Sequence, residues 1–297
     1  MNGPASSDYD IDLGPFVLSD YYHKTADELV IYTATNGAPP SDNVLFNGTT
    51  VDPDTGSGEY AKITLTSGKK HRLRLINTSK SSIPLSSYMT NNTTPGVENH
   101  LQLSIVNHNM TIIGTDFVPV NPYPTDSLFI AVGQRYDVII DANQDVDNYW
   151  FNVTYGGSGF CGSSNNPYPA AIVQYDGAAD GNPTDEGTTP IDHQCLDPMD
   201  LVPIVTRTVP TDFTPSSDNT LDVHLDLTAP TFVWYINNSS MTVDWDKPVA
   251  QYVYENDTDY PSTNNIWQVD GADQVSHYSK VVCQRGQCQA SILIAAS

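Results

Sequence analysis

The amino-acid sequence predicts an all-β protein, on three observations. The 297-residue chain contains 17 Tyr and many Thr, Asn, Asp and Pro residues but few Lys, a composition typical of short strands joined by polar turns. From residue 11 to residue 176, alternating or β-branched runs are separated by turn-forming clusters, which is the spacing of a sandwich or barrel. The hydrophobic content of 39% is enough for a buried core.

The elements expected along this first part are mainly short strands. Asn47-Gly48, Ser67-Gly68 and Val132-Gly133 are expected as turns between them. Thr25–Thr33 has apolar residues at helical spacing and is expected to form one or two helical turns at most. The expected strands are Phe16–Tyr22, Lys62–Leu65, Arg72–Asn77, Leu101–Asn107, Met110–Thr115, Ser127–Val132, Tyr136–Asp141, Trp150–Tyr155 and Ala171–Tyr175.

A boundary follows Asp176, where the composition changes to Gly, Pro, Asp and Thr. Such a stretch is typical of a linker that wraps over a surface. Strand patterns resume at Asp222–Leu227 and Phe232–Ile236, but too little chain follows for a second complete sandwich. From Val275 onward, no turn pattern connects the chain to what precedes it.

The charge balance excludes some partners. Lys and Arg total 12 against 35 Asp and Glu, which gives a net charge of -23. Nucleic acid and anionic membrane surfaces would repel such a molecule. No apolar run is long enough to cross a membrane, and we expect a monomer.

Sequons and cysteines favour secretion. Four cysteines agree with an oxidising compartment. The N-terminus has neither a basic region nor an apolar run, so we interpret the missing export signal as a missing N-terminus. The predicted glycosylation sites, which begin Asn-x-Ser/Thr sequons, are Asn47, Asn77, Asn91, Asn92, Asn109, Asn152, Asn237, Asn238 and Asn256.

Several segments together resemble one family, the ascomycete laccases, which are multicopper oxidases. In order, they resemble the end of domain one, all of domain two and the start of domain three of those enzymes, and the likeness covers residues 1–79 and 98–274. The segments are Gly3-Pro4-Ala5-Ser6, Tyr9–Gly14, Asp20–Tyr22, Ser41–Leu45, Asn47–Thr49, His71–Arg74, Val132–Val138, Asn148–Phe151 and Asp192–Asp197.

The resemblance implies a cupredoxin-like Greek-key β-sandwich or barrel as one complete domain, with an incomplete second one. It also implies a disulfide between Cys161 and Cys195. The expected organisation is a remnant of the connection between domains one and two at 1–14, the cupredoxin-like domain at 15–178 with an insertion at 80–97, a linker at 179–215, an incomplete domain three at 216–274 and an aberrant tail at 275–297.

Intact laccases use copper to couple the oxidation of phenols to the reduction of oxygen to water. Their coppers need closely spaced imidazoles and a thiolate. No two of the seven histidines here form a His-x-His pair, with a single residue between them, or a His-Cys-His sequence. His193 and Cys195 come nearest, but the implied disulfide is the stronger interpretation of Cys195. We therefore expect no catalytic residues, no metal ligands and no activity from this chain alone.

The resemblance also implies substrate-binding residues. Ala38 and Pro39 correspond to a loop that contacts the phenol, and Glu98 corresponds to a carboxylate that accepts its hydrogen bond. A carboxylate suits this role because it can take the phenolic proton as the electron leaves. The alternative is that Glu98 is a solvated loop acid. The inserted residues 80–97 lie next to Glu98 and are expected to disturb the pocket.

Two other interpretations remain open. Residues 80–97 and 275–297 could be translated introns, since Ser79–Ser81 and Val275-Ser276 can be encoded by fungal splice-donor sequences. The chain could also be a copper-free secreted glycoprotein that binds aromatic molecules or a partner. Stable, soluble expression of the chain alone would favour the second of these.

Overall fold

A computed structural model describes the chain as two compact units, Met1–Thr206 and Arg207–Ser297. The boundary between them falls inside the expected linker 179–215. The described residues are 8–36, 39–79, 81–82, 97–98, 100–155, 162–187, 196–206, 220–226, 233–236, 246–257, 259, 275–284 and 287–296.

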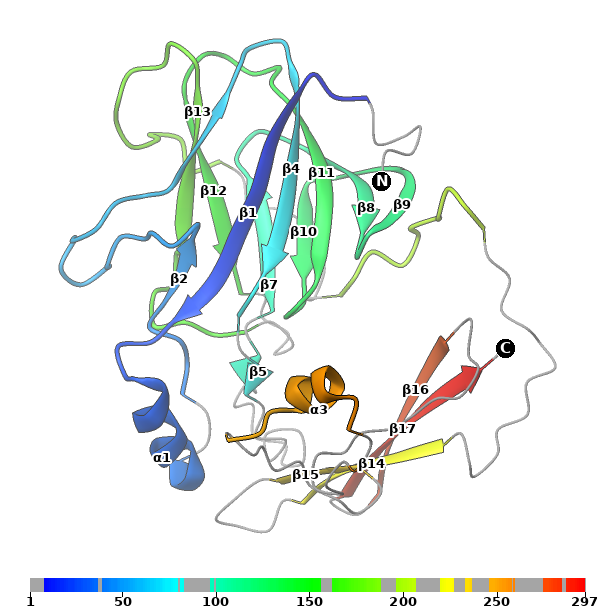
Figure 1. The fold of residues 1–297 in the computed structure, drawn as a ribbon. Coiled ribbons are helices and arrows are strands. Elements are labelled where there is room, and N and C mark those ends of the chain that lie inside the picture. The colour runs from blue at the N-terminus through cyan, green and yellow to red at the C-terminus, as the bar shows by residue number, and fades with distance from the viewer. Residues whose placement is uncertain are drawn as a thin grey trace. The chain divides into compact units, whose positions relative to one another are not determined.

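The two large β-sheets of the first unit face each other (Figure 1). Neighbouring strands are antiparallel except for the parallel pairs β1–β4 and β13–β3. The first sheet has the order β2 (Asn43–Phe46), β1 (Ile11–Tyr21), β4 (Lys70–Asn77), β11 (Arg135–Asp141), β8 (Met110–Thr115) and β9 (Val118–Thr125). The second has the order β10 (Ser127–Ile130), β7 (Leu101–Ile105), β12 (Asn148–Thr154), β13 (Ala170–Tyr175) and β3 (Lys62–Leu65). The expected all-β class is confirmed.

The core lies between the two sheets and follows the alternation of the strands. In β4, Leu73 and Leu75 are buried whereas Arg72 and Arg74 face outward, because successive side chains of a strand point to opposite faces. Three phenylalanine rings join the sheets at the centre. The ring of Phe151 lies 5.6 Å from that of Phe16 and 6.1 Å from that of Phe46, between ring centroids.

Helix α1 (Ala26–Asn36) is longer than the one or two turns expected from the sequence. Its start is stabilised by a capping box. The Thr25 hydroxyl accepts a hydrogen bond from the Glu28 amide at 3.4 Å, and the Glu28 carboxylate accepts one from the Thr25 amide at 2.8 Å. These bonds satisfy amides that otherwise lack partners at a helix start.

Two strands of the first sheet were not expected. The sequence of β9 contains three prolines, at 119, 122 and 124, which argue against a central strand. Because β9 is the last strand of its sheet, the missing amides cost it few hydrogen bonds. Residues 202–204 cover its edge, through hydrogen bonds from Asn121 N to Val202 O at 2.8 Å and from Ile204 N to Pro119 O at 3.0 Å. β2, the other unexpected strand, lies at the opposite edge.

The second unit contains one four-stranded sheet and a short helix, α3 (Val249–Glu255), among its described residues. The residues expected as an aberrant tail form a β-hairpin in which Cys283 lies opposite Cys288, and β17 pairs with β14. The sheet order is β15 (Val233–Ile236), β14 (Thr220–Asp226), β17 (Gln287–Ala296) and β16 (Val275–Gln284).

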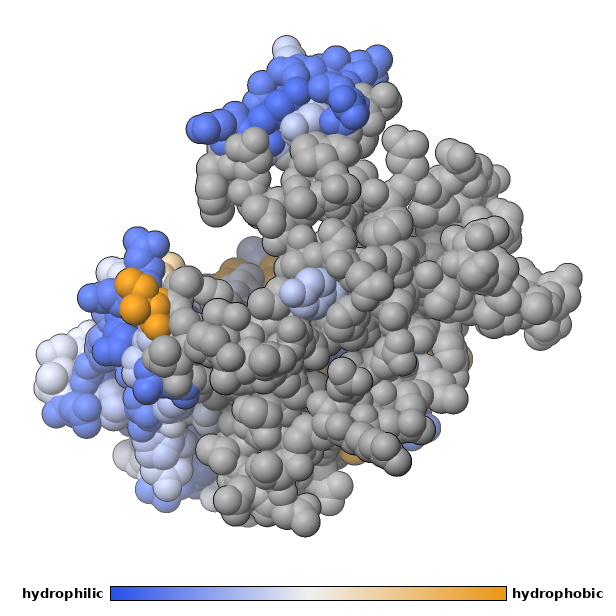
Figure 2. Space-filling model, turned by 90° about the horizontal axis from the view of Figure 1, so that it is seen from below, coloured by the Kyte–Doolittle hydropathy of each residue, from blue (hydrophilic) through white to orange (hydrophobic). Residues whose placement is uncertain are grey.

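The described residues on one face of the molecule are mostly polar. Figure 2 shows hydrophilic colours over most of the coloured residues on that face, with hydrophobic colour in a few small spots. No helix in the described part of the chain is long and apolar enough to cross a membrane.

Candidate functional site

The loop that carries the first two predicted substrate residues connects α1 to β2. Ala38 lies outside the described residues, and Pro39 is half-buried. Just beyond it, Ser41 is fully buried and donates from its amide and its hydroxyl to Ser163 O, at 3.2 Å in both cases. Asn165 N donates to Ser41 O at 2.7 Å. The loop is therefore held against the connection 162–165, which follows β12.

Glu98, the third predicted substrate residue, ends the short strand β6 (Val97–Glu98). This strand pairs with β5 (Ser81–Ser82), so that Ser81 lies opposite Glu98. The Glu98 side chain lies outside what the structure describes. Two residues on, His100 O accepts a hydrogen bond from Gly162 N at 2.9 Å. The segments after Pro39 and after Glu98 therefore both bind the connection 162–165, although some sixty residues separate them in sequence.

Aromatic side chains line this end of the sandwich. The His100 ring lies 5.5 Å from the Phe129 ring in an edge-to-face arrangement, and its Nδ1 accepts a hydrogen bond from Val132 N at 3.1 Å. Tyr155 and Ala131 both pack against Phe129. The buried Phe129 thus supports the half-buried side chains of His100 and Tyr155, and such rings can pack against another aromatic ring.

The Tyr155 hydroxyl is buried beside the hydroxyls of Ser164 and Ser41 but forms no hydrogen bond of normal geometry with either. Burial raises the pKa of this phenol well above its ordinary value, because the phenolate would lose its hydration. The hydroxyl therefore stays protonated and remains available as a donor.

An acidic residue completes this end. One oxygen of Asp42 accepts a hydrogen bond from the His23 amide at 2.7 Å, and the other accepts one from Asn165 Nδ2 at 2.8 Å. These bonds tie the residues before α1 to the connection 162–165. The site is thus built mainly by loops from distant parts of the chain, together with Phe129 of β10.

Two buried histidines, His71 and His108, have structural roles. His71 is buried, and its Nε2 accepts a hydrogen bond from Thr66 N at 3.0 Å. The two ring nitrogens of His108 lie 2.8 Å from Val106 O and 2.7 Å from the Tyr175 hydroxyl. Burial lowers the pKa of both histidines and keeps them neutral.

Across the part of the chain that the structure describes, no three His, Cys, Asp or Glu side chains come together as a group that could hold a metal. The donors present there do not fit a copper site. The predicted disulfide partners Cys161 and Cys195 lie outside the described residues, as does His193.

The predicted glycosylation sites differ in accessibility. Asn47, Asn109 and Asn256 are exposed, and Asn152 is half-buried. Asn77 is completely buried, with its Nδ2 donating to Ile130 O at 3.2 Å. A glycan on Asn77 would have to break this bond and open the core, so the fold disfavours it. The sites at Asn91, Asn92, Asn237 and Asn238 lie outside the described residues.

Sequence reasoning missed the contributions of Ser41 and Tyr155. The partners of Ser41 are 122 residues away in the chain, so no local spacing could have indicated the contact. Tyr155 was expected only as the end of a strand. The place of His100 beside Phe129 was not foreseen either.

Comparisons with known proteins give this geometry a context. The family model for multicopper oxidases matches residues 12–83 and 93–178. Over 280 residues, the chain is 56% identical to a laccase of Cryphonectria parasitica and 55% identical to Laccase-1 of Melanocarpus albomyces. These alignments cover 94% of this chain but only 44% and 42% of the relatives.

A solved structure agrees with the sequence comparison. The crystal structure of the laccase from Botrytis aclada superposes with a TM-score of 0.64 at 33% identity, covering 88% of this chain and 46% of that one. The chain thus spans less than half the length of each of these three proteins.

Proposed function

We propose, from the premise that this chain belongs to the multicopper oxidase family, that it supplies the scaffold and one wall of the phenol-binding pocket of a laccase-type enzyme. In this proposal, Pro39, Ala38 and Glu98 contact the phenol. The observation that carries it is that the segments after Pro39 and after Glu98 both bind the connection 162–165. Ser41 binds Ser163, and His100 binds Gly162. These contacts support a shared site for two segments that the resemblance assigns to one pocket.

Each group then has a definite task. The half-buried His100 ring, which packs on the buried Phe129, and the half-buried Pro39 offer apolar contact to an aromatic ring. The Glu98 carboxylate accepts the phenolic hydrogen bond and takes the proton when the phenol is oxidised, so that a neutral radical forms instead of a radical cation. Oxidation itself needs copper held elsewhere in the enzyme.

A hybrid enzyme tests the role of Glu98. Residues 8–206 would replace the matching part of the Melanocarpus albomyces laccase, with and without Glu98→Gln. Loss of the proton acceptor should lower kcat/KM for a phenol by about tenfold or more. An electron donor with no proton to lose should be oxidised at an unchanged rate.

Glu59→Gln is the matched control, because Glu59 is an exposed acid of the same domain. It should leave both rates unchanged. If Glu98→Gln lowers the two rates equally, or lowers neither, then Glu98 is not the proton acceptor.

We also propose that the insertion at 80–97 weakens the pocket. The two segments matched by the family model leave out residues 84–92, which supports an insertion beside Glu98. Deleting 84–92 from the hybrid should lower KM for the phenol. An unchanged KM would mean that the extra residues do not reach the substrate.

We further propose that the intact enzyme follows the secretory route, with a disulfide between Cys161 and Cys195. Support comes from the nine sequons and the even number of cysteines. Peptide mapping under non-reducing conditions tests it. A peptide pair that contains Cys161 and Cys195 is expected, and free thiols at both positions would contradict it.

A further inference from the structure

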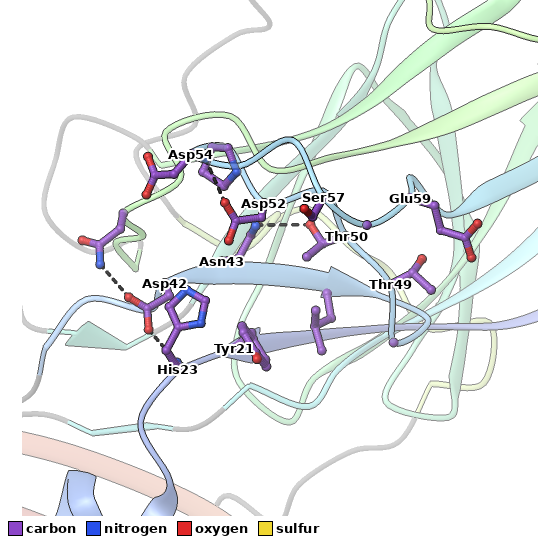
Figure 3. Close-up of a pocket in the computed structure, with 15 residues that line it drawn as sticks. Tyr21, His23, Asp42, Asn43, Thr49, Thr50, Asp52, Asp54, Ser57 and Glu59 are labelled. Atoms are coloured by element: carbon purple, nitrogen blue, oxygen red, sulfur yellow. Dashed lines mark hydrogen bonds between the residues drawn. The ribbon is translucent and has the colours of Figure 1, made fainter.

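A hollow lies beside β2 and shares His23, Asp42 and Asn165 with the loop end of the candidate site. It has a volume of about 510 Å³ and is lined by the end of β1, by β2, by the turn at 48–50 and by the loop 52–59 (Figure 3). We call it the β2 groove. None of Ala38, Pro39 and Glu98 lines it, so the proposed phenol site does not account for it.

The turn at one end of the β2 groove belongs to a sequon, Asn47-Gly48-Thr49. Asn47 and Gly48 both have positive φ angles, 49° and 87°, as a two-residue hairpin turn requires. Phe46 N donates to Thr49 O at 2.9 Å, and Thr49 N donates to Phe46 O at 3.1 Å. Gly48 and Thr49 also line the groove. Asn47, the residue of the sequon that would carry a glycan, therefore immediately precedes two residues that line the groove.

The Asn47 side chain is held by its oxygen alone. Its Oδ1 accepts a hydrogen bond from Val17 N at 2.7 Å, and the backbone N of Asn47 donates to Val17 O at 2.8 Å. Asn47 is exposed, and the structure describes no partner for its Nδ2. Glycosylation uses Nδ2 and leaves Oδ1 as an acceptor, so a sugar can be attached without disturbing the contact with β1.

The lining of the groove has the chemistry of a carbohydrate site. Asp52 accepts hydrogen bonds from the amides of Thr55 and Asp54, both at 2.9 Å. The Thr55 bond is the main reason that the pKa of Asp52 is lowered, so this carboxylate stays ionised as an acceptor for sugar hydroxyls. The Tyr21 ring, 40% exposed, offers a flat apolar face, and Figure 3 shows it between His23 and Thr50 along the groove.

A metal ion is a weaker candidate for the same place. Among the described residues no three acidic, histidine or cysteine side chains come close enough to hold one. Both oxygens of Asp42, another lining residue, are already used by His23 N and Asn165 Nδ2. The groove thus has hydrogen-bond acceptors spaced along its length, and they do not converge on one point as the ligands of a metal ion would.

We propose that Asn47 carries an N-linked glycan and that the β2 groove seats its first sugars. In the transfer, Asn47 Nδ2 forms a bond to C1 of the first N-acetylglucosamine of a lipid-linked oligosaccharide. The lipid pyrophosphate leaves from the same carbon, and the amide loses one proton. The seated sugars then cover Tyr21 and accept and donate hydrogen bonds along the groove. This inference rests on the proposed secretory route and not on the phenol site.

The test uses the full chain secreted from a yeast with an added export signal. Glycopeptide mass analysis should find a glycan on Asn47, which Thr49→Ala removes. An endoglycosidase that cuts between the first two sugars should release this glycan about tenfold more slowly from the folded protein than from the denatured protein.

Tyr21→Ala should remove most of that protection, and Asp54→Ala provides a second, exposed groove variant should Tyr21→Ala fail to fold. Tyr168→Ala is the matched control, since Tyr168 is 83% exposed and does not line the groove. An unmodified Asn47 would overturn the proposal. So would equal release from folded and denatured protein, or protection that neither groove variant reduces.

Discussion

The centre of the first unit and its loop end are held together in different ways. At the centre, apolar side chains from both sheets pack around Phe16, Phe46 and Phe151, all almost completely buried. At the loop end, Ser41, His100 and the connection 162–165 are joined by backbone and side-chain hydrogen bonds. Apolar packing is non-directional and tolerates changes of loop sequence, whereas hydrogen bonds fix particular segments. The fold can thus be retained while the pocket changes.

The largest effect that this comparison predicts is at the centre. Phe151→Ala removes the ring that contacts both Phe16 and Phe46, and it should lower the free energy of unfolding by about 3–5 kcal/mol. Chemical denaturation of the purified chain measures this. Tyr168→Ala, at an exposed position, should change it by less than about 0.5 kcal/mol. Similar effects from both variants would remove the distinction between centre and surface.

A smaller loss is expected at a polar group close to the loop end. Asn43 is buried, donates to Val51 O at 2.9 Å and accepts hydrogen bonds from Thr50 Oγ1 and Asn166 Nδ2 at 3.2 and 2.9 Å. Asn43→Ala leaves these groups without partners and should cost about 1–3 kcal/mol.

The cost of Asn43→Ala should overlap with that of Asn166→Ala, because both variants break the same bond. Unfolding of the double variant measures the overlap. Fully additive losses would mean that the pair does not act as a unit.

A pH effect tests the buried histidines. Burial lowers the pKa of His108 and His71, so below about pH 6.5 the unfolded chain binds protons that the folded chain does not. Stability should therefore be complete above that pH and fall as pH falls, by at most about 1.4 kcal/mol per pH unit for each histidine. His108→Gln should reduce this slope in denaturation curves measured from pH 7 to pH 5. An unchanged slope would exclude His108 as a source.

The smallest effect on stability is expected at the aromatic surface of the site. Tyr155→Phe removes a buried hydroxyl that lacks a hydrogen bond of normal geometry, so the free energy of unfolding should stay the same or rise by up to about 1 kcal/mol. In the hybrid enzyme, the same change should alter KM for the phenol. A loss of more than about 1 kcal/mol would mean that the hydroxyl has a partner.

The strands of the centre could be predicted because their signal is local. In β4, every second residue is buried, and the same alternation that buries Leu73 and Leu75 also buries Asn77. The burial of the Asn77 sequon was therefore readable from its position in the strand. The edge strand β9 escaped prediction, since its prolines are tolerated only where no neighbour needs their amides.

The site could be predicted only through resemblance. Ser41 and Ser163 are brought together by the fold of the two sheets, and nothing in the residues around either of them indicates the other. The capping box of Thr25 and Glu28 was a local signal that would have predicted a longer helix. The expectation of one or two turns rested on the apolar spacing alone, and the apolar residues of α1 form only a weak stripe.

Copper content tests most directly whether this chain provides scaffold and pocket without redox chemistry. The purified chain would be loaded with copper, dialysed and analysed for metal, with an absorption scan near about 600 nm for a copper–thiolate band. Copper far below one atom per chain and no band are expected, since no two histidines have the spacing that such sites need. Stoichiometric copper with a blue band would contradict the account and would direct attention to His193 and Cys195.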